Sequence, residues 1–137
     1  MKKIKLLKNI VLLGFVCMCG LFTLNSKTAI GGDNKNEMIL FYSPTCPHCH
    51  HALEFLDKEV APKYKNLIIT KHNASTKVGA NYYFHYAKKL NIANAGAVPL
   101  AIFGDKYELG FDEKETSKKY IQHIEEMLKS SEKEMKD

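Results

Sequence analysis

Apolar and polar positions alternate along this chain in blocks whose spacing predicts short strands and amphipathic helices. An uninterrupted apolar run at 38–42 is typical of a central strand that is covered on both faces. Apolar residues separated by charged ones at 53–60 predict a helix, and the i, i+3, i+4, i+7 stripe at 83–90 predicts another. Between these two helices, the apolar segment 67–70 predicts a second short strand.

Two further apolar runs, 97–103 and 106–111, lie on either side of Gly104 and Asp105 and predict a β-hairpin. The order is therefore strand, helix, strand, helix, strand, strand, helix. Strands joined by a helix run parallel and hairpin strands run antiparallel, so we predict an α/β fold with a mixed four-stranded sheet and helices on both faces.

The length and composition of the chain predict one domain, at 37–128, preceded by a polar linker at 32–36. Its last helix begins near Asp112 and Glu115, whose spacing resembles a capping box. The residues that follow, 129–137, are highly charged, and we expect them to form a C-terminal tail that frays into solvent.

The first 31 residues have the parts of a signal peptide, namely a lysine-rich start, an apolar run at 10–24 and small or polar residues after it. The apolar run is shorter than the roughly 20 residues that span a bilayer comfortably. We therefore expect a removed signal peptide rather than a retained N-terminal membrane anchor. Either way, the domain is predicted to be periplasmic or otherwise extracytoplasmic.

The net charge of +5 comes from five lysines in this N-terminal segment, because the remaining fifteen basic residues equal the fifteen acidic ones. The body also has no arginine and no basic stripe. This composition speaks against a nucleic-acid partner.

Cys46, Pro47, His48 and Cys49 lie where the first strand ends and the first helix begins. The first helical turn directs the backbone N–H groups of His48 and Cys49 toward the Cys46 sulfur, and Pro47, which has no N–H, suits a first-turn position. A thiolate at Cys46 is stabilised there by the helix dipole. A disulfide between cysteines only three positions apart closes too small a loop to stabilise a fold, so we predict a reactive dithiol rather than a structural disulfide.

A metal-binding module is the alternative from another class. Cys46 and Cys49 with His48, His50 and His51 are ligand types that suit copper(I) or zinc. They are crowded onto one helical turn, and the rest of the chain has no second ligand pair at zinc spacing. We therefore expect no metal and no cofactor.

The Cys-Pro-His-Cys motif in its strand–helix setting resembles the thioredoxin superfamily, and in particular the periplasmic disulfide-bond oxidases of the DsbA type. The resemblance covers about 37–128 and implies a minimal thioredoxin-like or glutaredoxin-like fold. It implies that Pro99 is a cis-proline beside the dithiol and that the Val98 backbone binds substrate. The implied activity is thiol–disulfide exchange, with Cys46 and Cys49 as the redox-active pair and Pro47 and His48 as the motif residues that tune it.

By this resemblance the partners are cysteine-containing exported proteins and a membrane redox protein, and the domain is a monomer. A partly protonated His48 beside Cys46 favours the oxidising direction. An exported reductase is the alternative. The chain departs from the DsbA type in two ways: 70–99 has no room for a helical insertion, and Leu40 stands where an acidic residue precedes the first cysteine by six positions.

Overall fold

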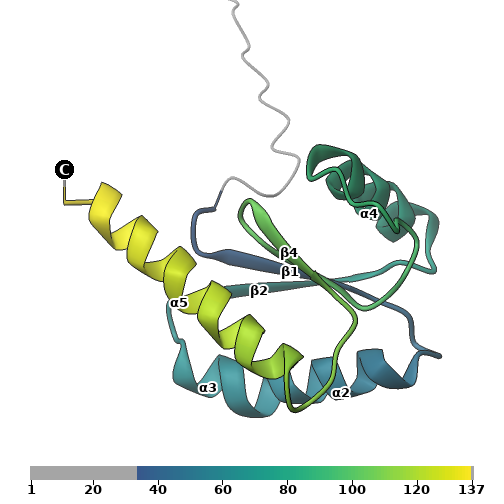
Figure 1. Cartoon of the computed structure of the whole chain (residues 1–137), viewed down its shortest axis with the longest axis horizontal. Coiled ribbons are helices and arrows are strands. Elements are labelled where there is room, and N and C mark those ends of the chain that lie inside the picture. Colours follow the sequence, from purple (N-terminus) through teal and green to yellow (C-terminus); the bar gives the residue numbers. More distant parts are fainter. Residues whose placement is uncertain (1–33, 137) are drawn as a thin grey trace, which may run out of the picture. The chain divides into compact units, whose positions relative to one another are not determined.

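The computed structural model describes residues 34–136, so the expected signal peptide or anchor lies outside the described residues. Four strands form one sheet, β1 (Glu37–Tyr42), β2 (Ile68–Asn73), β3 (Leu100–Phe103) and β4 (Lys106–Leu109), in the order β2-β1-β3-β4. β1 runs parallel to β2 and antiparallel to β3, and β3 is antiparallel to β4. Figure 1 shows the sheet between α4 (Lys77–Lys89) on one side and α2 (Pro47–Phe55) on the other. The predicted mixed four-stranded sheet is confirmed.

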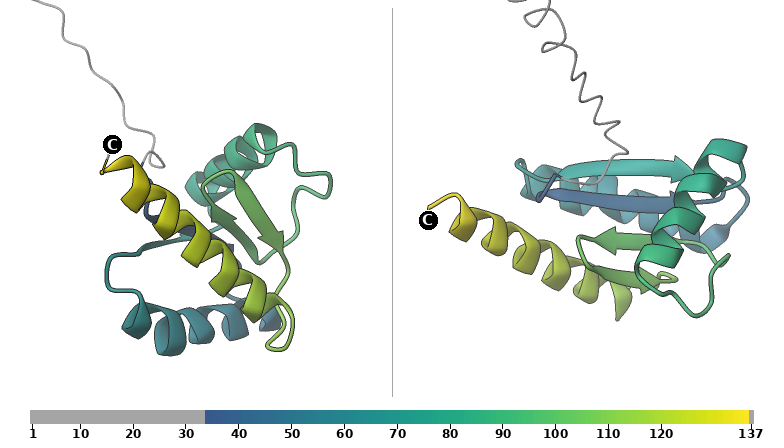
Figure 2. Two further views of the ribbon diagram at one scale, coloured as in Figure 1. Left: turned by 60° about the vertical axis from the view of Figure 1, so that its left-hand side comes forward. Right: turned by 90° about the horizontal axis from the view of Figure 1, so that it is seen from above.

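Helices cover the two faces of this sheet (Figure 2). After β1 the chain forms α2 (Pro47–Phe55), one π-helical segment (Leu56–Val60) and the short α3 (Ala61–Lys63). α4 (Lys77–Lys89) follows β2, and α5 (Thr116–Glu134) follows the hairpin. Within residues 34–136, no helix is long and apolar enough to cross a membrane.

Successive residues of β1 face opposite sides of the sheet, which gives the domain two apolar layers. Met38 and Leu40 pack with the helices α2 and α5, whereas Ile39 and Phe41 pack with α4. All four side chains are buried. This explains why β1 is apolar at consecutive positions: a central strand between two helix layers has no face left for polar side chains.

The C-terminal helix is longer than predicted. α5 continues to Glu134, so the expected fraying from residue 129 onward is wrong for the residues that the helix includes. The reason lies in Ser131, which is buried and whose hydroxyl donates hydrogen bonds to the carbonyls of Lys35 and Met127, both at 3.0 Å. This contact ties the last turns of α5 to the segment before β1.

Side-chain oxygens accept backbone N–H groups at the start of α4 and in the turn before α5. Thr76 Oγ1 accepts the Gly79 N–H at 3.0 Å at the start of α4. Asp112 Oδ1 accepts the N–H of Glu115 at 2.7 Å, as Asp112 would in the predicted capping box, but this bond lies in the turn before α5, which begins at Thr116 without a side-chain cap. The Glu115 N–H first, and then the Thr116 hydroxyl, which donates to Asp112 Oδ2 at 2.8 Å, lower the pKa of the Asp112 carboxyl.

Candidate active site

Cys46 is the residue before the first turn of α2, and its half-buried sulfur accepts the Cys49 N–H at 3.3 Å. Its carbonyl accepts the N–H groups of Cys49 at 3.1 Å and His50 at 3.2 Å, which fixes the turn. The sequence predicts this sulfur contact for His48 and Cys49, and Cys49 provides it. Cys46 is therefore placed where a helix N-terminus favours negative charge on sulfur.

Cys49 has the opposite environment. Its side chain is fully buried, and the Ser43 N–H donates to its sulfur at 3.5 Å. Burial first, and after it a hydrogen bond with Cys46, raise the pKa of the Cys49 thiol to about 12. Both cysteines are free thiols in this structure. The pair is thus divided into an accessible sulfur that can react and a buried one that keeps its proton.

The tertiary structure places Val98 and Pro99 beside the dithiol. The Cys46 thiol donates to the Val98 carbonyl at 3.7 Å, and the Val98–Pro99 peptide bond is cis, the geometry that the resemblance implies. The antiparallel register of β1 and β3 explains the contact: Phe41 near the end of β1 pairs with Leu100, the first residue of β3. Binding of substrate by the Val98 backbone stays a prediction.

The His48 side chain is exposed, and its Nδ1 lies 3.2 Å from the Phe111 carbonyl oxygen. A carbonyl can only accept a hydrogen bond, so Nδ1 carries the proton in this contact. The bond persists whether the ring is neutral or charged, because Nδ1–H is present in both forms. The Phe111 carbonyl belongs to the connection between β4 and α5, and a backbone acceptor of this kind leaves no signal in the sequence.

The two histidines after the motif have other partners. His50 Nε2 lies 2.7 Å from the Pro44 carbonyl, and His51 Nδ1 lies 3.2 Å from Glu113 Oε1. His48, His50 and His51 thus contact three different segments. In the described part of the chain, no group of three or more histidine, cysteine or acidic side chains is arranged to hold a metal ion. Pro47, the first residue of α2, is exposed beside Cys46.

A shallow hollow of about 370 Å³ adjoins the motif. It lies between the first turn of α2 and the connection that leads into α5, and its lining is made up of His48, His51, Phe111, Asp112, Glu113 and Lys114. Sequence reasoning did not connect the segment 111–114 with the site. Its closeness to the motif results from the His48–Phe111 contact and from the Gly110 N–H, which donates to the Pro99 carbonyl at 2.7 Å.

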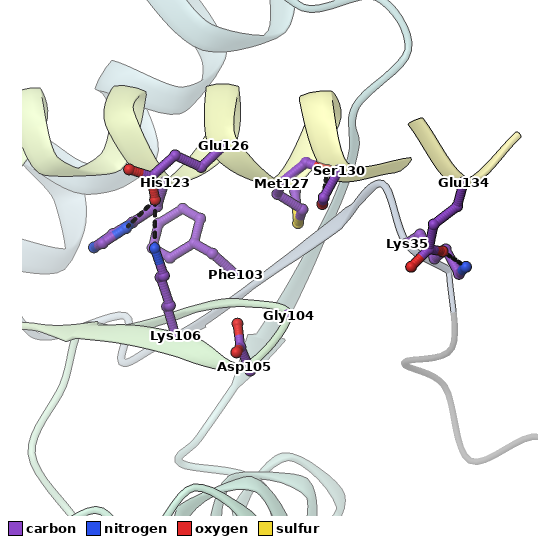
Figure 3. A pocket seen from close by; sticks show the side chains of 10 residues that line it. All are labelled: Lys35, Phe103, Gly104, Asp105, Lys106, His123, Glu126, Met127, Ser130 and Glu134. Carbon is purple, nitrogen blue, oxygen red and sulfur yellow. Dashed lines mark hydrogen bonds and ion pairs between the residues drawn. The ribbon is translucent and has the colours of Figure 1, made fainter. Parts of the chain in front are cut away.

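A second hollow, of about 360 Å³, lies at the other end of the sheet (Figure 3). Phe103 is on its wall and pairs with Met38 near the start of β1, whereas the dithiol follows the end of that strand. Two ion pairs border it, Lys35 with Glu134 and Lys106 with Glu126. No cysteine lines this hollow, so it is separate from the dithiol.

Comparisons with known proteins add little to this geometry. No family model matches the chain, and no curated protein matches it. Among solved structures, the chain is similar to a glutaredoxin from Archaeoglobus fulgidus, with 22% sequence identity and a TM-score of 0.45, over 61% of this chain and 84% of that chain. The fold and the site described above do not depend on this similarity.

Proposed function

We propose that the protein is an extracytoplasmic thiol–disulfide oxidoreductase that oxidises cysteines of exported proteins through Cys46 and Cys49. One observation carries the proposal: a half-buried Cys46 sulfur accepts the Cys49 N–H at the start of α2, beside a Cys49 thiol that burial keeps protonated. Two thiols so close in position and so different in environment suit exchange through a mixed disulfide.

In the oxidising direction the protein starts with a Cys46–Cys49 disulfide. A substrate thiolate attacks the Cys46 sulfur, the bond between the two cysteines breaks, and Cys49 leaves and takes up a proton. A second substrate thiolate then attacks the substrate sulfur of the mixed disulfide and releases Cys46. Two electrons pass from the substrate to the protein, and the substrate gains a disulfide. A membrane redox protein would remove these electrons and restore the Cys46–Cys49 disulfide.

The direction of exchange depends on how well the reduced form is stabilised. The Cys49 N–H at 3.3 Å from the Cys46 sulfur and the N-terminal end of α2 both favour a Cys46 thiolate. His48, two residues after Cys46, can add positive charge to the first turn of α2, and its contact with the Phe111 carbonyl at 3.2 Å restrains the ring. A more stable reduced form makes a stronger oxidant.

Equilibration with glutathione at known ratios of thiol to disulfide tests the activity and its direction together. We expect a reduction potential nearer to the roughly −120 mV of strong oxidants than to the roughly −270 mV of thioredoxin. A value near thioredoxin's would identify the alternative, an exported reductase. A pair that does not exchange with glutathione, or a Cys46→Ser variant that retains full exchange activity, would refute both directions.

The role of His48 is tested by comparison with His50. Both side chains are exposed, lie in the first turns of α2 and contact a backbone carbonyl, but His50 contacts Pro44, before the motif, whereas His48 contacts Phe111. We expect His48→Ala to lower the reduction potential and His50→Ala to leave it nearly unchanged. Equal effects of the two variants would show that His48 has no special role.

The proposed location rests on the sequence of the first 31 residues, with their lysine-rich start and apolar run at 10–24. Cell fractionation, with determination of the N-terminal residue of the mature protein, tests it. A mature N-terminus near residue 32 in an extracytoplasmic fraction supports a removed signal peptide. An intact N-terminus in the membrane fraction supports an anchor, and recovery in the cytosol contradicts both.

A further inference from the structure

The Tyr83 hydroxyl reaches the segment that leads to Val98. Tyr83 lies in α4 and is 2% exposed, and its ring packs edge-on against the buried Phe41 ring with 5.4 Å between centroids. Its hydroxyl donates to the Ala97 carbonyl at 2.8 Å and accepts the Gly96 N–H at 2.9 Å. A residue that the periodicity places in the core thus also makes two hydrogen bonds outside it.

The segment held by these bonds is exposed and precedes the contact with the dithiol. Residues 93–97 are all exposed, and Gly96 has a φ of 111°, a conformation that suits glycine. Val98 follows Ala97 directly, and its carbonyl accepts the Cys46 thiol at 3.7 Å. Because exposed segments with few apolar contacts move readily, bonds to a buried side chain determine how well such a segment keeps its position.

The Tyr83 ring is held in place by packing against the sheet. Phe41, against which its ring packs, pairs with Leu100, the second residue after Val98. Burial raises the pKa of the Tyr83 hydroxyl, although the Gly96 bond lowers it, so the group remains a donor to Ala97 at neutral pH. The same core therefore positions β3 after Pro99 and, through Tyr83, the segment before Val98.

We propose that Tyr83 is a positioning residue for disulfide exchange, whose hydroxyl fixes Gly96 and Ala97 so that the Val98 backbone stays beside Cys46 for an extended peptide substrate. This inference rests on the proposed function. It names a substrate class, since a cysteine within an extended peptide chain can hydrogen-bond to the Val98 backbone and a small thiol cannot. Loss of the Tyr83 hydroxyl then weakens exchange with peptides and spares exchange with small thiols.

Tyr83→Phe keeps the ring and removes the two hydrogen bonds. Tyr120→Phe is the control for the loss of a buried hydroxyl, because Tyr120 is fully buried and its hydroxyl has no hydrogen-bond partner among the described residues; since Cys49 acts electrostatically on this hydroxyl, the ratio of the peptide rate to the small-thiol rate is what the two variants are compared by. Each variant of the full-length chain, in the oxidised form, is assayed with a synthetic two-cysteine peptide and with 2-mercaptoethanol. For Tyr83→Phe we expect kcat/KM for the peptide to fall about tenfold, mainly through KM, and the 2-mercaptoethanol rate to change less than about twofold.

Amide hydrogen exchange provides a second measurement that needs no activity. The Gly96 N–H, which donates to the Tyr83 hydroxyl, should exchange faster in Tyr83→Phe than in the wild type and at the wild-type rate in Tyr120→Phe. Unchanged peptide kinetics in Tyr83→Phe, or an equal loss with both substrates, would overturn the inference while the proposed function stands. A wild-type protein inactive toward both substrates would overturn the proposed function, and unchanged Gly96 exchange would then overturn the role of Tyr83 as well.

Discussion

Alkylation of the reduced protein tests the division of roles between the two cysteines. A pKa of about 12 for Cys49, instead of the ordinary 9.0, makes its thiolate fraction at neutral pH about a thousandfold smaller. Only the thiolate reacts with iodoacetamide at a useful rate. Burial adds to this effect, because the Cys49 side chain is 0% exposed and the reagent cannot approach it without local opening.

The expected result is labelling of Cys46 alone at short times. The reduced protein is treated with iodoacetamide at neutral pH, quenched at intervals and digested, and tandem mass spectrometry locates the label within the peptide that contains both cysteines. We expect Cys46 to be labelled more than about a hundredfold faster than Cys49. The same treatment in denaturant is the control, since unfolding exposes both thiols and should make their rates similar.

Labelling of Cys49 as fast as Cys46 in the native protein would refute this division of roles. Such a result would mean that the second sulfur is accessible and ionised. The proposed mechanism, in which Cys49 leaves as the protected member of the pair, would then lose its structural basis.

Three further predictions concern stability. Replacing Gly79 by alanine adds a Cβ that would lie 1.9 Å from the Asn73 carbonyl oxygen; this clash outweighs the gain of about 1 kcal/mol in helix propensity, so thermal or urea unfolding should show a net loss of about 2 kcal/mol or more. Ser131→Ala should cost about 1 kcal/mol in the same assay, because it leaves the Lys35 carbonyl without this donor, and no loss would show that the end of α5 is not held by this contact. Because the pKa of Cys49 is raised on folding, the folded protein keeps a proton that the unfolded chain releases between pH 9 and 12. The free energy of unfolding of the reduced wild type should therefore fall relative to that of Cys49→Ala as the pH rises from about 9 toward 12, and the two should change in parallel below that range. Parallel plots of this free energy against pH over the whole range would contradict the raised pKa of Cys49.

Patterns in the sequence predict most of the fold because local spacing encodes it. The apolar run of β1, the stripe of α4 and the Gly104–Asp105 turn each report which face of an element is buried or where the chain reverses. The length of α5 is the exception. Its last turns are charged, and a tertiary bond from Ser131, rather than an apolar stripe, holds them in place.

The sequence alone was enough to single out the proposed redox pair: two cysteines at the start of a helix, with Pro47 and His48 between them, have an environment largely set by neighbours along the chain. Only the tertiary structure decided what surrounds that pair. Strand register brings Val98 to Cys46, and the connection after β4 brings the Phe111 carbonyl to His48. The packing of α2 on the sheet buries Cys49. Contacts between residues more than 50 positions apart depend on how the elements pack, and such packing has no signature in local spacing.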